Sequence, residues 1–364
     1  MVESEDRERL ARTFRRFAEA EAVPQGSPVY ERLCEVVATD DVLLDIAAEV
    51  SPGQPSPNLL FGAVHALLDT HREDPLAAYY PSCGGHRPPD DGLGPAFRAF
   101  VLAHRPEVEE LLHTRLVQTN EVRRSAVLLP VFATVAEDAG GAPLALIEIG
   151  ASAGLNLLFD RYAYRYHRGA ETVRAGAEGS PLVLECESRD VELPVQRTPA
   201  VASRLGLELN ALDVRSDADV RWLRSLVWPE HETRRHVLEA AIAVAREEPP
   251  EVRTSDVFEV LPDAIVSAPA DARVLVFATF VLNQFSEPMR DRLKALLLDA
   301  SRRREISVVV VGFSGWFGAE RRDIGSAPVV LATLRDGRGE WRQLAVADPH
   351  GWWIDWRPDD ARPW

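Results

Sequence analysis

The stretch Leu144–Asn156 reads LALIEIGASAGLN and joins a β-rich run to a glycine turn. Its first six residues are apolar except for Glu148, so they predict a buried strand. Gly150, Ser152 and Gly154 follow at alternate positions, and a helix-like run begins after them. Glycine lets the backbone approach a ligand closely, and a helix N-terminus offers free N–H groups. This strand, turn and helix unit is therefore typical of cofactor-binding α/β domains.

After this stretch, short β-rich runs alternate with helix-like runs, which indicates a parallel sheet with crossover helices. The last two β-rich runs flank the turn at residues 336–339 and predict an antiparallel hairpin. We therefore expect an α/β fold with a Rossmann-like, seven-stranded sheet, mostly parallel with a C-terminal antiparallel hairpin. The seven runs are LALIEI, LGLELN, EVRTS, RVLVFATF, ISVVVVGF, APVVLATLR and EWRQLAVA.

Before this stretch, apolar residues recur at helical spacing from residue 4 to about residue 138. The sequence thus predicts an all-helical N-terminal domain over 1–140 and a Rossmann-like domain over 141–364, with an insertion near 163–198. The β-like pieces YAYRYH and SPLVLECES lie in that insertion. The predicted helices cover residues 4–22, 28–38, 40–49, 57–70, 93–103, 105–117 and 119–138.

The composition narrows the classes of partner. With 41 basic and 57 acidic residues, the formal charge is −16, and such a field repels a phosphate backbone. We expect no nucleic-acid partner. The first ten residues are highly charged, and no run reaches the roughly 18 apolar residues of a membrane span, so we also expect no membrane insertion and a cytoplasmic location. The sequence fixes no oligomeric state.

Two residue types exclude further classes of chemistry. The three cysteines are far apart and form no C-x-x-C pair, and no other spacing resembles a metal site, so we expect no bound metal. Lys294 is the only lysine. A phosphate-binding P-loop and a Schiff-base enzyme both need a lysine, and Lys294 lies on a predicted amphipathic helix instead.

The glycine turn resembles motif I of class I S-adenosylmethionine-dependent methyltransferases, commonly written E/D-x-G-x-G-x-G. Ser152 stands in place of the middle glycine. The resemblance implies that the loop Gly150–Gly154 wraps the methionine part of S-adenosylmethionine, with Glu148 near the cationic groups of the cofactor. Such enzymes have a Rossmann-like fold, and the similarity covers about residues 142–348.

The resemblance also implies a second acid, which ends the second strand and binds the ribose hydroxyls, because a carboxylate accepts hydrogen bonds from both. In LGLELNALD, Glu208 is the first candidate and Asp213 the second. Glu208 lies 54 residues after Gly154, farther than usual, so the insertion has to intervene. If YAYRYH is the second strand instead, Glu171 or Glu185 becomes the candidate.

Two later positions complete the implied cofactor site. Asp256 follows a short strand and resembles the acid that contacts the adenine amine, although a helix N-cap explains it equally well. Thr279 ends the next strand, where such enzymes carry substrate or catalytic residues. No N/D-P-P-Y/F motif follows it, so methylation of amino groups on bases or glutamine loses its usual support.

The polar run TNEVRR at residues 119–124 begins an otherwise apolar helix that leads into motif I. It either lines a pocket or caps the helix. A methyl transfer from a sulfonium needs an acceptor in place and sometimes a base, and Glu121, His350 and Tyr80 are the candidates. An aromatic and histidine group, which includes Tyr80, His350 and Trp352, either closes a substrate cavity or packs an interface.

Three other interpretations of the turn stay open. Gly150–Gly154 also spells G-x-S-x-G, the nucleophile elbow of a serine hydrolase that uses Ser152, with His350 in the right chain order. A hydrolase, however, places several strands before its nucleophile, and the 140 residues before Leu144 are predicted to be helical. The turn is otherwise purely structural, or belongs to a non-catalytic or regulatory domain that binds S-adenosylmethionine.

The combination of TNEVRR, LIEIGASAGLNLLFDRY and DPHGWW resembles an uncharacterised bacterial family, known only as a domain of unknown function, over nearly the whole chain. This likeness supports the fold and implies no activity. Our hypothesis from the sequence is S-adenosylmethionine-dependent methyl transfer to a small-molecule acceptor.

Overall fold

The computed structural model describes residues 4–118, 120–189, 192–319 and 325–364. The chain divides by internal contacts into two compact units. Unit 1 comprises Met1–Thr119 and Arg215–His236, and unit 2 comprises Asn120–Val214 and Val237–Trp364. The sequence placed one boundary at residue 140, whereas the contacts assign residues 120–140 to unit 2 and a later segment to unit 1.

Unit 1 is helical over its described residues, and its helices match most of the predicted ones. Residues 28–38 and 93–103 are helical as predicted. Side chains cap several helix starts; for example, Ser27 accepts a hydrogen bond from the amide of Tyr30. The elements are α1 (Ser4–Phe17), η1 (Ala18–Ala22), α2 (Pro28–Ala38), α3 (Asp41–Ala47), α4 (Ser56–Leu68), η2 (Pro75–Tyr79), η3 (Pro81–Cys83), α5 (Leu93–Ala103), α6 (Arg105–Thr114) and α8 (Asp217–Ser225).

Helix α4 is the centre of unit 1. It is buried nearly all round, as expected for a helix that is apolar on every face. The Phe61 ring stacks on Tyr30 at 4.7 Å and meets the edges of Phe14 and Phe97 at 5.8 and 6.0 Å. Such aromatic pairs stabilise a core beyond the area that they bury.

Unit 2 contains one twelve-stranded mixed sheet, in the order β3-β2-β4-β11-β10-β9-β8-β7-β1-β5-β6, with β12 paired to β10. Strands β6, β5, β1, β7 and β8 pair in parallel with their neighbours, and β8, β9 and β10 pair antiparallel. The strands are β1 (Leu144–Ile149), β2 (Ala163–Arg168), β3 (Glu171–Gly176), β4 (Val183–Ser188), β5 (Val201–Glu208), β6 (Val252–Thr254), β7 (Arg273–Thr279), β8 (Ile306–Val311), β9 (Ala327–Arg335), β10 (Arg338–Ala347), β11 (Trp353–Trp356) and β12 (Arg362–Pro363).

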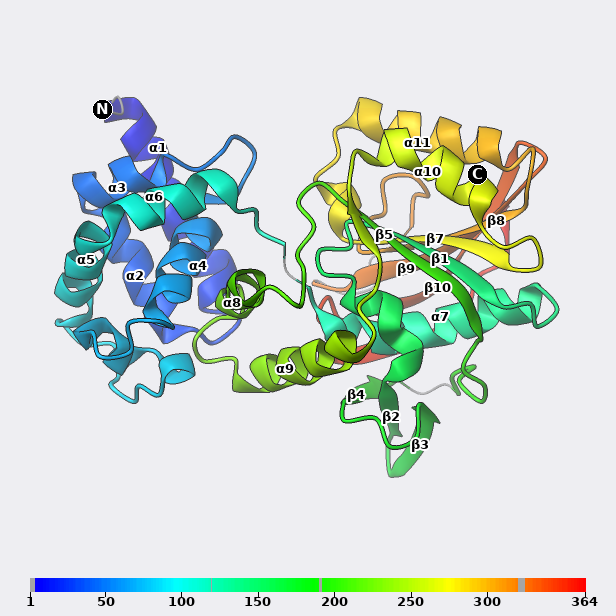
Figure 1. Cartoon of the computed structure of the whole chain (residues 1–364), viewed down its shortest axis with the longest axis horizontal. Helices are drawn as coiled ribbons and strands as arrows, with labels where there is room; N and C mark the ends of the chain where they lie inside the picture. Colours follow the sequence, from blue (N-terminus) through cyan, green and yellow to red (C-terminus); the bar gives the residue numbers. More distant parts are fainter. Residues whose placement is uncertain (1–3, 119, 190–191, 320–324) are drawn as a thin grey trace. The chain divides into compact units, whose positions relative to one another are not determined.

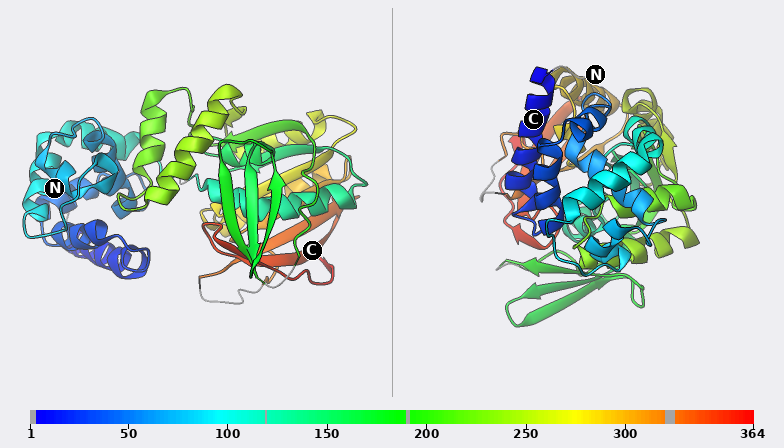
Figure 2. Two further views of the ribbon diagram at one scale, coloured as in Figure 1. Left: turned by 90° about the horizontal axis from the view of Figure 1, so that it is seen from below. Right: turned by 90° about the vertical axis from the view of Figure 1, so that its left-hand side faces the viewer.

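The α/β class is confirmed, but the sheet is larger than the predicted seven strands. The seven predicted runs are all strands and lie consecutively from β6 to β10. Strand β11, in a segment that the sequence marked only for its aromatic residues, pairs with β10 on one side and with β4 on the other. This contact joins the insertion to the sheet, and Figure 2 shows β2, β3 and β4 in green, side by side.

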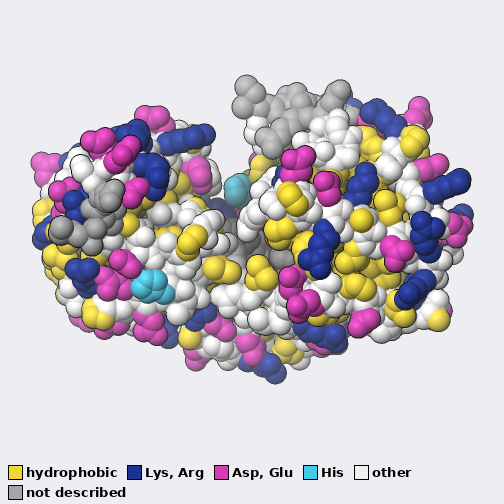
Figure 3. Space-filling model, turned by 90° about the horizontal axis from the view of Figure 1, so that it is seen from above, with side chains coloured by type: hydrophobic (Ala, Val, Ile, Leu, Met, Phe, Trp, Pro, Cys, Tyr) yellow, Lys and Arg dark blue, Asp and Glu magenta, His cyan; other side chains and the backbone are white. Residues whose placement is uncertain are grey.

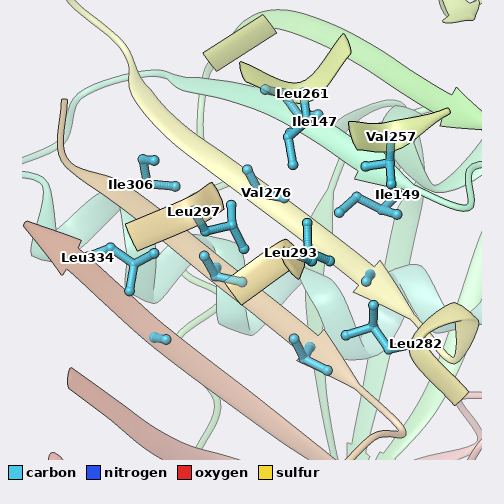
Figure 4. Close-up of a cluster of buried hydrophobic side chains, with 14 of the residues drawn as sticks. Ile147, Ile149, Val257, Leu261, Val276, Leu282, Leu293, Leu297, Ile306 and Leu334 are labelled. Atoms are coloured by element: carbon cyan, nitrogen blue, oxygen red, sulfur yellow. The ribbon is translucent and has the colours of Figure 1, made fainter. Parts of the chain in front are cut away.

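Helices cover both faces of the sheet in unit 2 (Figure 1). On one face, α10 (Val257–Ser267) and α11 (Glu287–Ala300) pack apolar side chains such as Leu261 and Leu293 against Ile147 and Val276 (Figure 4). On the other face, the ring of Phe132 meets the edge of Phe277 at 5.1 Å. Phe132 belongs to α7 (Ser125–Asp138), which begins six residues later than predicted.

The predicted C-terminal hairpin is confirmed. Asp336 and Gly337 join β9 and β10, and their φ angles are 52° and 75°. Two central residues with positive φ make a type I′ turn, whose twist matches that of the flanking strands. The Asp-Gly pair in the sequence therefore carried a specific turn geometry.

The described residues contain no helix long and apolar enough to cross a membrane. On the face drawn in Figure 3, acidic and basic side chains of the described residues are interspersed. Helix α9 (Glu232–Glu247) carries residues of both units. The short 3₁₀ turns η4 (Val122–Arg124), η5 (Leu155–Arg161) and η6 (Val281–Asn283) belong to unit 2.

Candidate functional site

The strand order of unit 2 reverses between β1 and β7. After β1 the chain first forms β2, β3 and β4 at the far edge of the sheet. It then adds β5 and β6 on one side of β1, and β7 and β8 on the other. In open α/β sheets, ligands bind outside the carboxyl ends of the strands at such a switch point. The carboxyl ends of β1 and β7 are therefore the candidate ligand site of unit 2.

Backbone strain gathers at these two strand ends. Of the described residues, three non-glycine residues have a positive φ: Ser152 at 53°, Phe280 at 64° and Asp336 at 52°. Asp336 belongs to the hairpin turn. Ser152 follows β1 and Phe280 follows β7, so the other two flank the switch point. Left-handed backbone costs an L-residue about 1–2 kcal/mol and clusters at functional sites.

The glycines of the turn are required by contacts within the protein. A Cβ atom on Gly150 would lie 2.7 Å from Val281, and one on Gly154 would lie 2.8 Å from Val252. Both glycines also have φ near 74°, a conformation that other residues rarely adopt. The structural interpretation of these two glycines therefore has direct support.

The element after the turn is shorter than the expected helix. It is η5 (Leu155–Arg161), a 3₁₀ helix of seven residues with a kink at Leu158. The chain enters β2 two residues later, so a longer helix has no room. A free helix N-terminus thus contributes little here.

Glu208 lies directly beside the turn. It ends β5, which pairs directly with β1, so the strand beside β1 is the one that contains Glu208. Its Oε2 accepts a hydrogen bond of 2.8 Å from the Ser152 amide, and Oε1 accepts one of 2.8 Å from the Leu209 amide. Glu171 and Glu185 lie in β3 and β4, remote from β1 in the strand order.

The segment after β5 also contacts the turn, because the Leu212 amide donates to the Ser152 carbonyl at 3.2 Å. Asp213, the next residue along the chain, is half-buried.

Glu148 is a buried carboxyl at the end of β1. Its side chain lies on the same sheet face as Phe277, its partner in register, and only 2% of the residue is exposed. Burial raises the pKa of Glu148 well above its usual range; Asn156, through a hydrogen bond, and Arg124 oppose this shift, and Glu208 adds to it. Its Oε2 has no hydrogen-bond partner among the described residues.

The two remaining predicted cofactor residues occupy strand ends. Asp256 follows β6 and caps α10, because its side chain accepts from the Phe258 amide at 2.9 Å. This is the N-cap that the sequence allowed, and the Asp256 side chain is exposed. Thr279 ends β7 and is 8% exposed.

Two polar segments far apart in sequence meet beside the turn. Residue 119 lies outside the described residues. Asn120 donates from Nδ2 to the carbonyl of Ala151 at 3.2 Å, and Arg124 donates from Nε to the carbonyl of Pro349 at 2.9 Å. A Cβ atom on Gly351 would lie 2.4 Å from the Arg123 carbonyl, so only glycine permits this approach.

Glu121 and His350 form a pair within these segments. His350 Nδ1 lies 3.3 Å from Glu121 Oε2, within ion-pair distance, but the two atoms are not aligned for a hydrogen bond. Glu121 is 4% exposed, whereas 29% of the His350 side chain is exposed. The other Glu121 oxygen caps the 3₁₀ turn η4 (Val122–Arg124) by accepting from the Arg123 amide.

Tyr80 belongs to unit 1, where it is fully buried. Its ring lies 5.4 Å from that of His65, and its hydroxyl has no hydrogen-bond partner among the described residues. Burial raises the pKa of Tyr80 well above its usual range.

Sequence reasoning missed three contributors to the site of unit 2. Ser125 donates to Asn156 Oδ1 at 2.9 Å, and Asn156 also bonds Glu148. Phe280 carries the strain after β7, and the guanidinium of Arg124 lies 4.2 Å from the centre of its ring. Asn156 was detectable as the one polar residue in the apolar run LNLLF, whereas the strain at Phe280 leaves no signal in the sequence.

The sequence matches, over residues 11–356, a family described as "Uncharacterized protein conserved in bacteria (DUF2332)". The chain belongs to this family. TNEVRR, the glycine turn and DPHGWW, the segments by which the sequence resembled an uncharacterised bacterial family, all fall within the match. A search of the curated proteins found no match. Among the described residues of this family member, no cluster of three or more acidic, histidine or cysteine side chains could hold a metal ion.

Proposed function

We propose that unit 2 binds S-adenosylmethionine at the carboxyl ends of β1 and β5 and transfers its methyl group to a small molecule. The supporting observation is the conformation of Ser152. It replaces the middle glycine of the motif yet has the left-handed φ of 53° that glycine favours. The strain is retained although glycine would relieve it, as at functional sites in general.

The arrangement around Ser152 supports the same proposal. The strand order β6-β5-β1-β7-β8 corresponds to strands 3-2-1-4-5 of a Rossmann sheet. Glu208 then ends the second strand and contacts the turn at Ser152, which suits a carboxylate that accepts from ribose hydroxyls. The finer assignment to a methyltransferase sheet rests on this likeness.

Glu148 suits a cationic ligand. A buried carboxyl with an unpartnered oxygen is costly, and a positive group nearby offsets that cost. The sulfonium and ammonium groups of the cofactor are such groups. Asp256 and Thr279 stand at the neighbouring strand ends, where the adenine and the acceptor would lie. When bound, the cofactor supplies an activated methyl group, so the protein's task is to position the acceptor.

Titration calorimetry with S-adenosylmethionine and S-adenosylhomocysteine tests the proposal. We expect micromolar binding to the full chain and at least tenfold weaker binding to Glu208→Ala. Glu171→Ala is the matched control because Glu171 is an exposed carboxylate on β3, and its affinity should equal that of the wild type. Gly150 is unsuitable for this test, since any side chain there collides with Val281.

Ser152 distinguishes the remaining alternatives. Ser152→Gly should keep the affinity for the cofactor, since glycine adopts the same backbone conformation without strain. A lack of binding at millimolar ligand contradicts the proposal. Labelling of the wild type by a fluorophosphonate, lost in Ser152→Ala, would instead support a serine hydrolase. If the protein binds the cofactor but forms no methylated product, the result would support a regulatory protein that binds S-adenosylmethionine without catalysis.

A further inference from the structure

The segment that carries His350 is held in one conformation. Asp348 Oδ1 accepts hydrogen bonds from the backbone amides of His350 at 2.8 Å and Trp352 at 3.3 Å. Gly351, with a φ of 78°, lies against the backbone of Arg123, and Arg124 bonds the Pro349 carbonyl. A side chain on so constrained a loop has a defined direction, which a catalytic group needs.

The two nitrogens of His350 have different surroundings. Nδ1 faces the buried carboxylate of Glu121 at 3.3 Å, within ion-pair distance but without a hydrogen bond. Catalytic hydrogen bonds are often this loose without a ligand. Nε2 makes no hydrogen bond or ion pair among the described residues, and 29% of the His350 side chain is exposed. A proton on Nδ1 donated to Glu121 leaves the lone pair on Nε2, because one ring nitrogen fixes the role of the other.

The Glu121–His350 pair differs from the other histidine–carboxylate pairs of the described residues. In His113–Glu49, 53% and 49% of the two side chains are exposed, and His167 and His236 lie 3.8 Å from carboxylates whose side chains are 52% and 71% exposed. Such surface pairs contribute little. In the Glu121–His350 pair, only 4% of the carboxylate side chain is exposed. Placing a charged group inside the protein is costly, so a buried orienting carboxylate is a built feature.

We propose that His350 is the general base of unit 2 and that Glu121 is its positioning residue. This inference rests on the proposed methyl transfer and deepens it by naming the class of acceptor. The pair matches a base held by a third group, but no nucleophilic side chain of the described residues bonds Nε2. The proton to be removed therefore belongs to the substrate.

The acceptor is then a molecule whose attacking atom carries a proton, as in a phenol, an alcohol or an amine. The attacking oxygen or nitrogen forms a bond to the methyl carbon while its proton moves to Nε2 of His350. The bond from that carbon to the donor sulfur breaks, and its electron pair stays on sulfur. The imidazolium afterwards releases the proton to water. A thioether acceptor has no such proton, so its methylation would not need His350 as a base.

The tautomer of His350 tests the geometry without any cofactor. Nitrogen-15 NMR of the histidine side chains should show the Nδ1–H form for His350 in the full chain, and the Nε2–H form in Glu121→Leu. An Nε2–H form in the wild type would overturn the inference. The wild-type spectrum decides even if Glu121→Leu does not fold.

Chemical modification tests the role in the site. Diethyl pyrocarbonate acylates accessible imidazole lone pairs, and mass spectrometry locates the products. We expect His350 to react, and saturating S-adenosylhomocysteine to slow that reaction at least fivefold. His113 is the matched control, since it is exposed and should react equally with and without the ligand.

The outcomes separate the two proposals. If calorimetry finds no binding of S-adenosylhomocysteine, the proposed function fails, whatever the tautomer. If the ligand binds but leaves the modification rate of His350 unchanged, the cofactor site stands and the assignment of the base is wrong.

Discussion

His65 in unit 1 and His350 in unit 2 have opposite surroundings, although both lie in polar networks. His65 is only 5% exposed, with Nδ1 at 3.1 Å from the Ser225 carbonyl and Nε2 at 2.7 Å from Ser82 Oγ. His350 faces a carboxylate with one nitrogen only. A serine beside a histidine resembles a nucleophile and its base, but a base that water and substrate cannot reach serves packing.

The buried titratable groups His65 and Glu148 show the same contrast between the two units. Around His65 burial favours the neutral imidazole and lowers its pKa to about 4, and both ring nitrogens are satisfied. At the strand ends of unit 2, burial favours the neutral form of Glu148, yet one of its oxygens has no partner. His65 thus has both ring nitrogens satisfied, whereas Glu148 has a carboxyl oxygen without a hydrogen-bond partner among the described residues. Under the proposed function, that oxygen is available to a ligand.

The largest expected effect is that of His65→Ala. The change leaves Ser82 Oγ and the Ser225 carbonyl without partners and opens a cavity, so we expect α4 to lose about 4 kcal/mol of stability. Hydrogen exchange of peptides from α4, read by mass spectrometry, measures this loss. His113→Ala, at an exposed histidine, should change the same peptides by less than about 0.5 kcal/mol. Equal losses in the two variants would contradict the contrast.

The next effect is the acid sensitivity of unit 1. The folded pKa of His65 lies near 4 and its ordinary value is 6.5, so the unfolded state binds a proton first as the pH falls. The stabilisation is complete above pH 6.5 and is lost as the pH falls through 4, by about 3 kcal/mol in total. Exchange of the α4 amides between pH 7 and 4, corrected for the intrinsic rate, measures it. His65→Gln lacks the titrating group and should show a flatter profile; an unchanged slope would refute the assignment.

The smallest effect has the opposite sign and belongs to unit 2. The folded pKa of Glu148 is raised, so its contribution to stability is present below its ordinary pKa of 4.5 and is lost as the pH rises through the folded value. Glu148→Gln should therefore gain stability relative to the wild type at pH 8, by about 1 kcal/mol, the scale of one unsatisfied buried group. Exchange of β1 and β7 peptides at pH 5 and 8 measures the gain. A gain at pH 5 instead would reverse the sign of the argument.

The strands and helices were easier to predict from the sequence than their assembly into a sheet. Each of the seven predicted β-rich runs is a strand, because alternation and buried apolar runs are local signals. The size of the sheet, in contrast, depends on contacts between distant segments, for which the sequence has no local signal. Strand β11 joins the insertion to the sheet by pairing with β4, which is about 165 residues away in the chain. A four-residue strand next to a histidine and several tryptophans has no hydrophobic pattern from which this pairing could be predicted.

The candidate site shows the same division. The acid Glu208 was selected as the end of a β-rich run, and its contact with Ser152 followed from strand pairing that the long insertion had obscured. Glu121, His350 and Tyr80 were predicted as candidate bases from their residue types alone, without any indication of which of them lie together. The structure pairs Glu121 with His350 and assigns Tyr80 to the core of the helical unit.

By itself, the sequence determined the elements of the α/β fold, the glycine turn and the acidic charge, because these depend on residues close together in the chain. It also placed the chain in its family. The tertiary structure alone decided that the sheet has twelve strands, that Ser152 and Phe280 are strained at the switch point, and that Glu121 faces His350. The physical reason is that burial, strain and ion pairing arise from contacts between distant segments, and no window of sequence contains both partners.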